Sequence, residues 1–191
     1  MKTKNKTVTA LTFYQWLNLY ELITKKEYTE KDLFAYRGLW HSTMHHGSFS
    51  ATTPEATLQN INARLLQAHQ TVPKLDWLML TFGTAYVYEA KETGKVVSNC
   101  HKLPENDFNR RLLSVDEIVD EYTSLITDMA ACNATLKFLF TVSPIRHIRD
   151  GMHANQLSKS TLLLAVDRLQ QSFPEQVFYF PSYEIVLDEL R

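Results

Sequence analysis

Apolar residues along this chain follow two patterns. Residues 76–83, 136–144 and 176–181 are short, nearly continuous apolar runs bounded by polar, glycine or proline residues. Such runs are typical of strands that are buried on both faces, as in a parallel sheet. Between and around them, apolar residues recur every three or four positions, which indicates helices with one buried face. The alternation of the two patterns predicts an α/β fold built on a parallel sheet.

Helical spacing predicts helices over residues 12–24, 30–36, 54–72, 115–129, 162–173 and from 182 onward. Ser114 and Glu117 form a capping box before the fourth of these, and Pro54 opens the third. Gly38 is expected to end the second. Residues 38–53 have no period and are expected to form a loop, whereas residues 85–99 predict two extended pieces around a glycine turn.

Composition narrows the class of protein. The chain has 191 residues, of which 45% are hydrophobic and 21% are charged, and its formal net charge is -1. These values are typical of a folded globular protein. The chain has no basic cluster beyond Lys6, which argues against nucleic acid and anionic membranes as partners. It also has no apolar run near the roughly 20 residues of a membrane span and no signal-peptide pattern, so we expect a cytoplasmic protein.

Cysteine usage gives no sign of a metal site or a disulfide scaffold. Cys100 and Cys132 are the two cysteines, and neither belongs to a CxxC pattern. Cys100 precedes His101, but adjacent residues in a strand point to opposite faces, so a cysteine nucleophile with that histidine as its base is disfavoured. We expect no cofactor.

Two polar loops follow predicted strands, where ligands bind in open parallel sheets. After the first strand, Gly83 permits a sharp turn that exposes backbone N–H groups, and with the Thr84 hydroxyl these could form an oxyanion hole. An ordinary turn is the competing interpretation.

The loop after the second strand reads "TVSPIRHIRDGMHANQLSK". Asp150 and His153 have the Asp-x-x-His spacing of a carboxylate that orients a general base. Alternatively, Asp150 or Asn155 caps the following helix. Arg146 and His147 are candidates for the same pocket, since an arginine there could hold a carboxylate or a phosphate.

A histidine-rich segment, "HSTMHHGSFSA", lies between residues 41 and 51. It brings together three histidines and several serines, but neither a carboxylate nor a cysteine joins them. A zinc site is therefore a minority interpretation, and no metal is expected.

Several motifs together resemble the GSCFA domain, a bacterial family placed in the SGNH hydrolase superfamily. They are "GLWHSTMHHGSFS", "LTFGTAYVYE", "NCHKLP", "RLLSVDEIV", "FTVSPIRHIRDGMHANQLSK" and "YFPSYEIVLDELR", in this order. The resemblance covers about residues 25–191, and residues 1–24 are expected to form a separate helical segment. It implies a three-layer α/β/α SGNH fold, similar to flavodoxin, and ester hydrolysis or acyl transfer by a serine.

The resemblance assigns roles to some residues and leaves others out. Gly83 and Thr84 match the oxyanion position, although the superfamily has asparagine where Thr84 stands. The Gly-Ser-Cys-Phe-Ala motif of the expected nucleophile is absent, and Ser48 in "GSFSA" is expected to be a decoy because no buried strand precedes it. Asp150 and His153 follow an internal strand, whereas the superfamily's base follows the last one. Nucleophile strand and base are therefore expected to lie outside these 191 residues.

Three hypotheses follow for the chain. It is a shortened, inactive relative of the ester hydrolases and acyltransferases, a non-catalytic binding protein, or a gene fragment without a role of its own. The binding hypothesis takes a small acyl ester or an acylated glycan as ligand, in a pocket of His46, Thr84, Arg146 and His147. Without a first strand, the strand over residues 76–83 would have a bare edge through which the chain could associate with itself.

Overall fold

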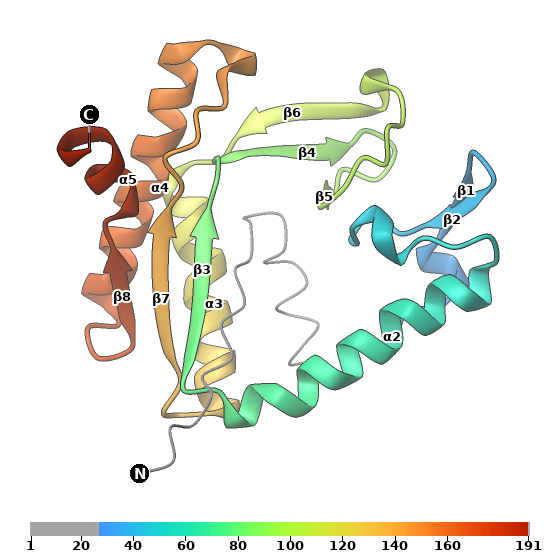
Figure 1. Cartoon of the computed structure of the whole chain (residues 1–191), viewed down its shortest axis with the longest axis horizontal. Coiled ribbons are helices and arrows are strands. Elements are labelled where there is room, and N and C mark those ends of the chain that lie inside the picture. The colour runs from blue at the N-terminus through green and yellow to red at the C-terminus, as the bar shows by residue number, and fades with distance from the viewer. Residues whose placement is uncertain (1–26, 191) are drawn as a thin grey trace. The chain divides into compact units, whose positions relative to one another are not determined.

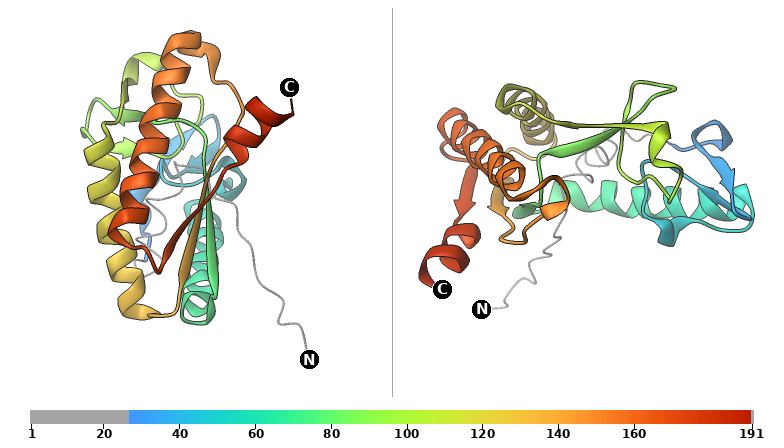
Figure 2. Two further views of the ribbon diagram at one scale, coloured as in Figure 1. Left: turned by 90° about the vertical axis from the view of Figure 1, so that its left-hand side faces the viewer. Right: turned by 90° about the horizontal axis from the view of Figure 1, so that it is seen from above.

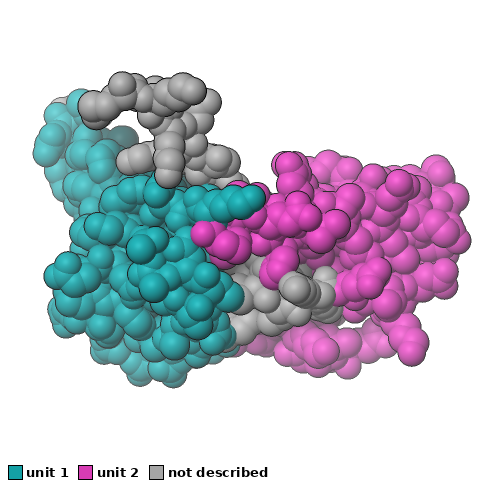
Figure 3. Space-filling view, turned by 90° about the horizontal axis from the view of Figure 1, so that it is seen from below, with its two compact units in different colours: residues 1–13, 74–86, 112–191 teal, residues 14–73, 87–111 magenta. Residues whose placement is uncertain are grey.

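The computed structural model describes residues 27–190. These fall into two compact units, which Figure 3 colours separately. The first unit contains residues 74–86 and 112–190, and the second contains residues 27–73 and 87–111. The helix predicted over residues 12–24 and the domain boundary predicted after residue 24 lie outside the described residues, so both stay predictions.

A parallel sheet forms the centre of the first unit. Its strands are β3 (Trp77–Phe82), β7 (Lys137–Val142) and β8 (Val177–Phe180), in the order β3-β7-β8 (Figure 1). All three strands occupy predicted positions, and both pairings are parallel. Phe138 and Phe140 of the central strand are fully buried. The predicted α/β class is therefore confirmed.

Two long helices connect these strands and lie on the same side of the sheet (Figure 2). The first, α3 (Val115–Cys132), begins at the predicted capping box, in which the Glu117 N–H donates to the Ser114 Oγ at 3.1 Å. The second, α4 (Met152–Ser172), begins ahead of the predicted start at residue 162. Its first turns escaped prediction because they bury polar residues, as the candidate site shows.

The first unit ends in a short helical segment after β8. This segment consists of α5 (Ser182–Glu184) and a π-helical turn over Ile185–Glu189. A helix was predicted from residue 182 onward, and the structure confirms its start. Tyr183 is the buried residue of α5.

The second unit contains α2 (Pro54–Thr71) and two small antiparallel arrangements of strands. The N-cap of α2 is Thr53, whose Oγ1 accepts a hydrogen bond from the Ala56 N–H at 3.2 Å. Ile61 and Leu65 of this helix pack with Tyr28 in a small buried cluster. The predicted helix and its opening are confirmed.

The helix predicted over residues 30–36 is wrong beyond its first turn. A 3-10 turn over Glu30–Asp32 leads into β1 (Phe34–Tyr36), which pairs with β2 (Leu39–His41). Arg37 and Gly38 connect the strands with φ values of 50° and 78°, as in the two-residue turns that suit hairpins. Gly38 therefore turns a hairpin and does not end a helix. The segment predicted as a loop contains β2.

A second sheet contains β4 (Tyr86–Ala90), β5 (Val96–Val97) and β6 (Phe108–Leu112), in the order β5-β4-β6. The two extended pieces predicted around Gly94 are β4 and β5, which pair antiparallel. Gly94 has a φ of 66°, a backbone conformation that favours glycine. The remaining 3-10 turns cover Gly47–Phe49, Val72–Lys74, Glu105–Asp107 and Ile148–Asp150. In the part of the chain that the structure describes, no helix is both long and apolar enough to cross a membrane.

Candidate functional site at the carboxyl edge of the parallel sheet

Two strands of the first unit end in the polar loops that the sequence predicted as ligand-binding. Gly83 follows β3, and Ser143 follows β7. The Ser143 N–H donates to the Phe82 carbonyl at 2.8 Å, so the ladder between the two strands continues to the start of both loops. Both loops therefore begin at the same edge of the sheet, where open α/β folds bind ligands.

Gly83 and His147 come together at this edge. The His147 Nε2 atom lies 3.3 Å from the place that a Cβ on Gly83 would occupy. The side chain of Asn155 holds the loop that contains His147, because the His147 N–H donates to the Asn155 Oδ1 at 2.8 Å. Any side chain at position 83 would push against the imidazole. Glycine at position 83 therefore lets the imidazole come this close, and two of the predicted residues are neighbours.

The Thr84 hydroxyl is part of a buried network. Its Oγ1 lies 2.9 Å from the Ser158 Oγ and accepts a hydrogen bond from the Tyr86 N–H at 3.2 Å. The Ser158 Oγ also accepts from the Ala85 N–H at 2.7 Å. Thr84 and Ser158 are 6% and 2% exposed. The hydroxyl that the sequence predicted as an oxyanion donor thus holds the loop after β3 against α4, and its role toward a ligand stays a prediction.

A lysine that the sequence reasoning did not select lies beneath both loops. The Lys159 Nζ donates to the Gly83 carbonyl at 2.5 Å and to the Ser143 carbonyl at 2.6 Å. Lys159 is fully buried, and this burial lowers the pKa of its ammonium to about 8. Lys159 lies three residues before Leu162, where the predicted apolar stripe begins, so extending that stripe backward by helical spacing was the available signal.

The predicted Asp-x-x-His pair lies at the start of α4. Asp150 ends the 3-10 turn Ile148–Asp150, and His153 is the second residue of the helix. Both side chains are exposed to solvent. The prediction that Asp150 or Asn155 caps α4 is wrong, since the N-cap is Gly151 and no side chain caps the helix. Asn155 instead binds the backbone of His147, as described above.

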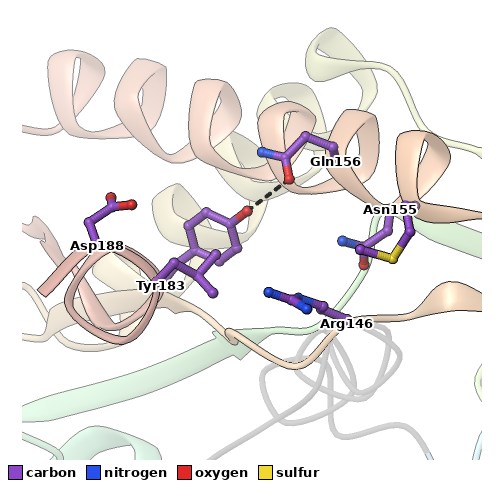
Figure 4. Close-up of a pocket in the computed structure, with 7 residues that line it drawn as sticks. Arg146, Asn155, Gln156, Tyr183 and Asp188 are labelled. Carbon is purple, nitrogen blue, oxygen red and sulfur yellow. Dashed lines mark hydrogen bonds between the residues drawn. The ribbon is translucent and has the colours of Figure 1, made fainter. Parts of the chain in front are cut away.

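Arg146 lines a pocket of about 350 Å³ next to the His147 loop. Figure 4 shows Arg146 beside Asn155, with Gln156, Tyr183 and Asp188 further along. The Tyr183 hydroxyl donates to the Gln156 Oε1 at 3.1 Å. The pocket combines a guanidinium with amide groups and an aromatic ring. Such a lining can hold a small ligand that has both polar and apolar parts.

His46 and Ser48 belong to the second unit. Ser48 lies within the 3-10 turn Gly47–Phe49, and its N–H donates to the His46 Nδ1 at 3.2 Å, so His46 caps this turn. The nearest preceding strand, β2, ends at His41. A nucleophile elbow needs a strand that leads directly into the serine turn, and Ser48 has no such strand.

His41 and Ser50 form a hydrogen-bonded pair that resembles a nucleophile and its base. The His41 Nδ1 lies 2.7 Å from the Ser50 Oγ, and its Nε2 lies 3.2 Å from the Tyr36 carbonyl. However, the N–H of the following residue, Ala51, donates to the Thr57 Oγ1 at 3.0 Å. This N–H would be the natural oxyanion donor for Ser50, and it is already engaged. The pair is therefore better explained as a link between β2 and the turn before α2.

Neither metal nor disulfide chemistry is supported by the described residues. Among residues 27–190, no group of three or more His, Cys, Asp and Glu side chains could hold a metal ion. Neither Cys100 nor Cys132 forms a disulfide. The predicted absence of a cofactor remains a prediction.

Comparison with known proteins gives one match. No curated protein and no solved structure matches the chain. The model of the GSCFA family matches residues 2–191, which is nearly the whole sequence, and it agrees with the motifs that carry the resemblance. The chain therefore belongs to the GSCFA family.

Proposed function

We propose that this chain binds acyl esters, including acylated glycans, at the carboxyl edge of the β3-β7-β8 sheet. In this proposal, backbone N–H groups at Gly83 and Thr84 receive the carbonyl oxygen of the ester. The imidazole of His147 lies beside them, and the pocket lined by Arg146 receives the rest of the ligand. The observation that carries the proposal is the approach of His147 Nε2 to Gly83. It places an imidazole nitrogen next to backbone that carries no side chain.

The SGNH resemblance supplies the chemical class. In that superfamily, backbone donors at the position of Gly83 stabilise the oxyanion that forms when a serine attacks an ester. We further propose that these 191 residues do not turn the ester over. The Gly-Ser-Cys motif is absent from the sequence, and Ser48 lies in a 3-10 turn without a leading strand. Asp150 and His153 are exposed, whereas a base needs a carboxylate that holds it in one orientation.

The proposal is tested by measuring binding and turnover on the same protein. Calorimetric titration with short-chain acyl esters and acetylated oligosaccharides should give saturable binding, and p-nitrophenyl acetate should show no hydrolysis above the rate in buffer. Turnover that disappears in Ser48→Ala would refute the non-catalytic part of the proposal. Absence of binding to every ester would refute the whole.

A matched pair of glycine variants locates the site. In Gly83→Ala, the new methyl group would lie 3.3 Å from the His147 Nε2, so the imidazole has to move and ester binding should weaken by about tenfold. Gly47→Ala adds the same methyl group where no atom lies within 4 Å, and it should bind as the wild type does. Equal affinities in the two variants would place the ligand elsewhere.

A further inference from the structure

Lys159 is an unusual residue for the middle of a buried helix face. Its side chain is fully buried, and its Nζ bonds to two backbone carbonyls that terminate adjacent strands, those of Gly83 and Ser143. Placing an ammonium away from water is costly, and an uncharged side chain of similar length would fill the same space without that cost. Packing alone therefore does not explain a lysine at this position.

The bond to Gly83 also determines the orientation of the next N–H group. The peptide between Gly83 and Thr84 is trans, as are all peptide bonds of the described residues. In a trans peptide, the C=O and the N–H point in opposite directions. Because Lys159 holds the Gly83 carbonyl, the Thr84 N–H points away from the ammonium. None of the described residues accepts a hydrogen bond from this N–H.

We propose that Lys159 is a positioning residue that fixes the Gly83–Thr84 peptide so that the Thr84 N–H donates to the oxygen of a bound ester. The second bond, to the Ser143 carbonyl, fixes the loop that leads to His147 relative to this peptide. The ammonium also withdraws electron density from the Gly83 carbonyl, which makes the Thr84 N–H a stronger donor. This role rests on the proposed function, since it concerns the same ligand site.

The test compares two ligands that differ in charge on the atom that the N–H would contact. An alkyl phosphonate monoester is anionic and tetrahedral, as an ester is during attack, whereas the carboxylic ester of the same alkyl chain is neutral and planar. Lys159→Met should weaken binding of the phosphonate by tenfold or more and binding of the ester by less than threefold. Lys137→Met is the matched control, because Lys137 is an exposed lysine at the opposite end of β7.

The outcomes separate the two proposals. If the wild type binds neither ligand, the proposed function fails. If the wild type binds both, and Lys159→Met weakens both equally or neither, the ester site stands and the positioning role is wrong. In amide NMR spectra, the Thr84 resonance should move more in Lys159→Met than in Lys137→Met. An unchanged Thr84 resonance would also overturn the role.

A measurement on the wild type covers the case in which Lys159→Met does not fold. The Thr84 amide resonance should shift as pH passes through the titration of Lys159. Two other ionisable side chains lie nearby, namely Tyr183, whose ring centroid lies 6.0 Å from the Lys159 Nζ, and His147, beside Gly83. The titration is therefore repeated in Tyr183→Phe and in His147→Gln. Loss of the Thr84 shift in either variant would assign it to that residue and refute the role of Lys159.

Discussion

Removing the Ser158 hydroxyl tests whether the loop after β3 is held as the structure describes. Ser158 accepts the Ala85 N–H and shares a hydrogen bond with Thr84, and Ala85 is fully buried. In Ser158→Ala, the Ala85 N–H keeps no partner in this network and is too deep to reach water. The variant isolates this loss because only one atom is removed from the helix face.

The magnitude follows from that buried donor. An unsatisfied buried N–H costs about 1–3 kcal/mol, and the lost bond between the two hydroxyls adds about 1 kcal/mol. Alanine is the better helix former, which offsets about 0.5 kcal/mol of this loss in the free energy of unfolding. The free energy of unfolding of the first unit should therefore fall by about 2 kcal/mol.

Urea unfolding measures this change in the first unit alone. Trp77 of β3 becomes the only tryptophan in a Trp16→Phe, Trp40→Phe background, so its fluorescence reports this unit. With a slope typical of small domains, a loss of about 2 kcal/mol lowers the urea midpoint by about 1 M. The slope itself should stay unchanged.

Ser124→Ala is the matched control for Ser158→Ala. Ser124 lies in α3, is exposed, and donates to the Asp120 carbonyl one turn earlier, at 3.1 Å. Its removal should change the free energy of unfolding by less than about 0.5 kcal/mol. If Ser158→Ala and Ser124→Ala cost the same, the buried network at the end of β3 does not hold the loop.

Two further changes test the core and the buried charge. Phe140→Ala should lower the free energy of unfolding by about 3–5 kcal/mol in the same assay, because Phe140 is fully buried. Phe180→Ala is the control and should lower it far less, because Phe180 is 50% exposed. Similar losses in the two variants would contradict the placement of β7 at the centre of the sheet. Burial lowers the pKa of Lys159 from 10.5 to about 8. Between pH 8 and pH 10 the unfolded chain therefore binds more protons than the folded chain, so the free energy of unfolding should rise with pH. We expect a rise of about 1–2 kcal/mol, which includes a reduction for solvent screening. Burial raises the pKa of Tyr122, which lowers stability above pH 10 and sets the upper limit of this window. Lys159→Met should remove the rise, and a variant that keeps it would show that another group causes it.

Apolar patterns predicted the parallel sheet because each of its strands is a continuous apolar run. Such a run can be recognised in the sequence without knowing which strand it pairs with. The capping box at Ser114 and Glu117 located the start of α3 for the same reason, since both residues act within one turn. The small hairpin of β1 and β2 was missed. Its two strands are three residues long each, which is too short for alternation to be distinguished from helical spacing.

The candidate site was predicted in part. Gly83 and His147 were selected from their loops, and the structure brings them together. Ser158 and Lys159 were not selected, because a polar residue ahead of an apolar helical stripe reads as solvent-exposed. Their partners in the loop after β3 lie more than 70 positions earlier in the chain, and a sequence gives no sign of such partners.

Three residues of α4 together specify the shape of the candidate site. Asn155, Ser158 and Lys159 are spaced three and four apart, so they share one face of the helix. Between them they bind four backbone atoms, namely the N–H groups of His147 and Ala85 and the carbonyls of Gly83 and Ser143. Backbone N–H and C=O groups are the same in every amino acid except proline, which lacks the N–H, so the loops can exchange many side chains without losing these bonds. Ligand preference could thus diverge through the loops, while the helix keeps the framework of the site constant.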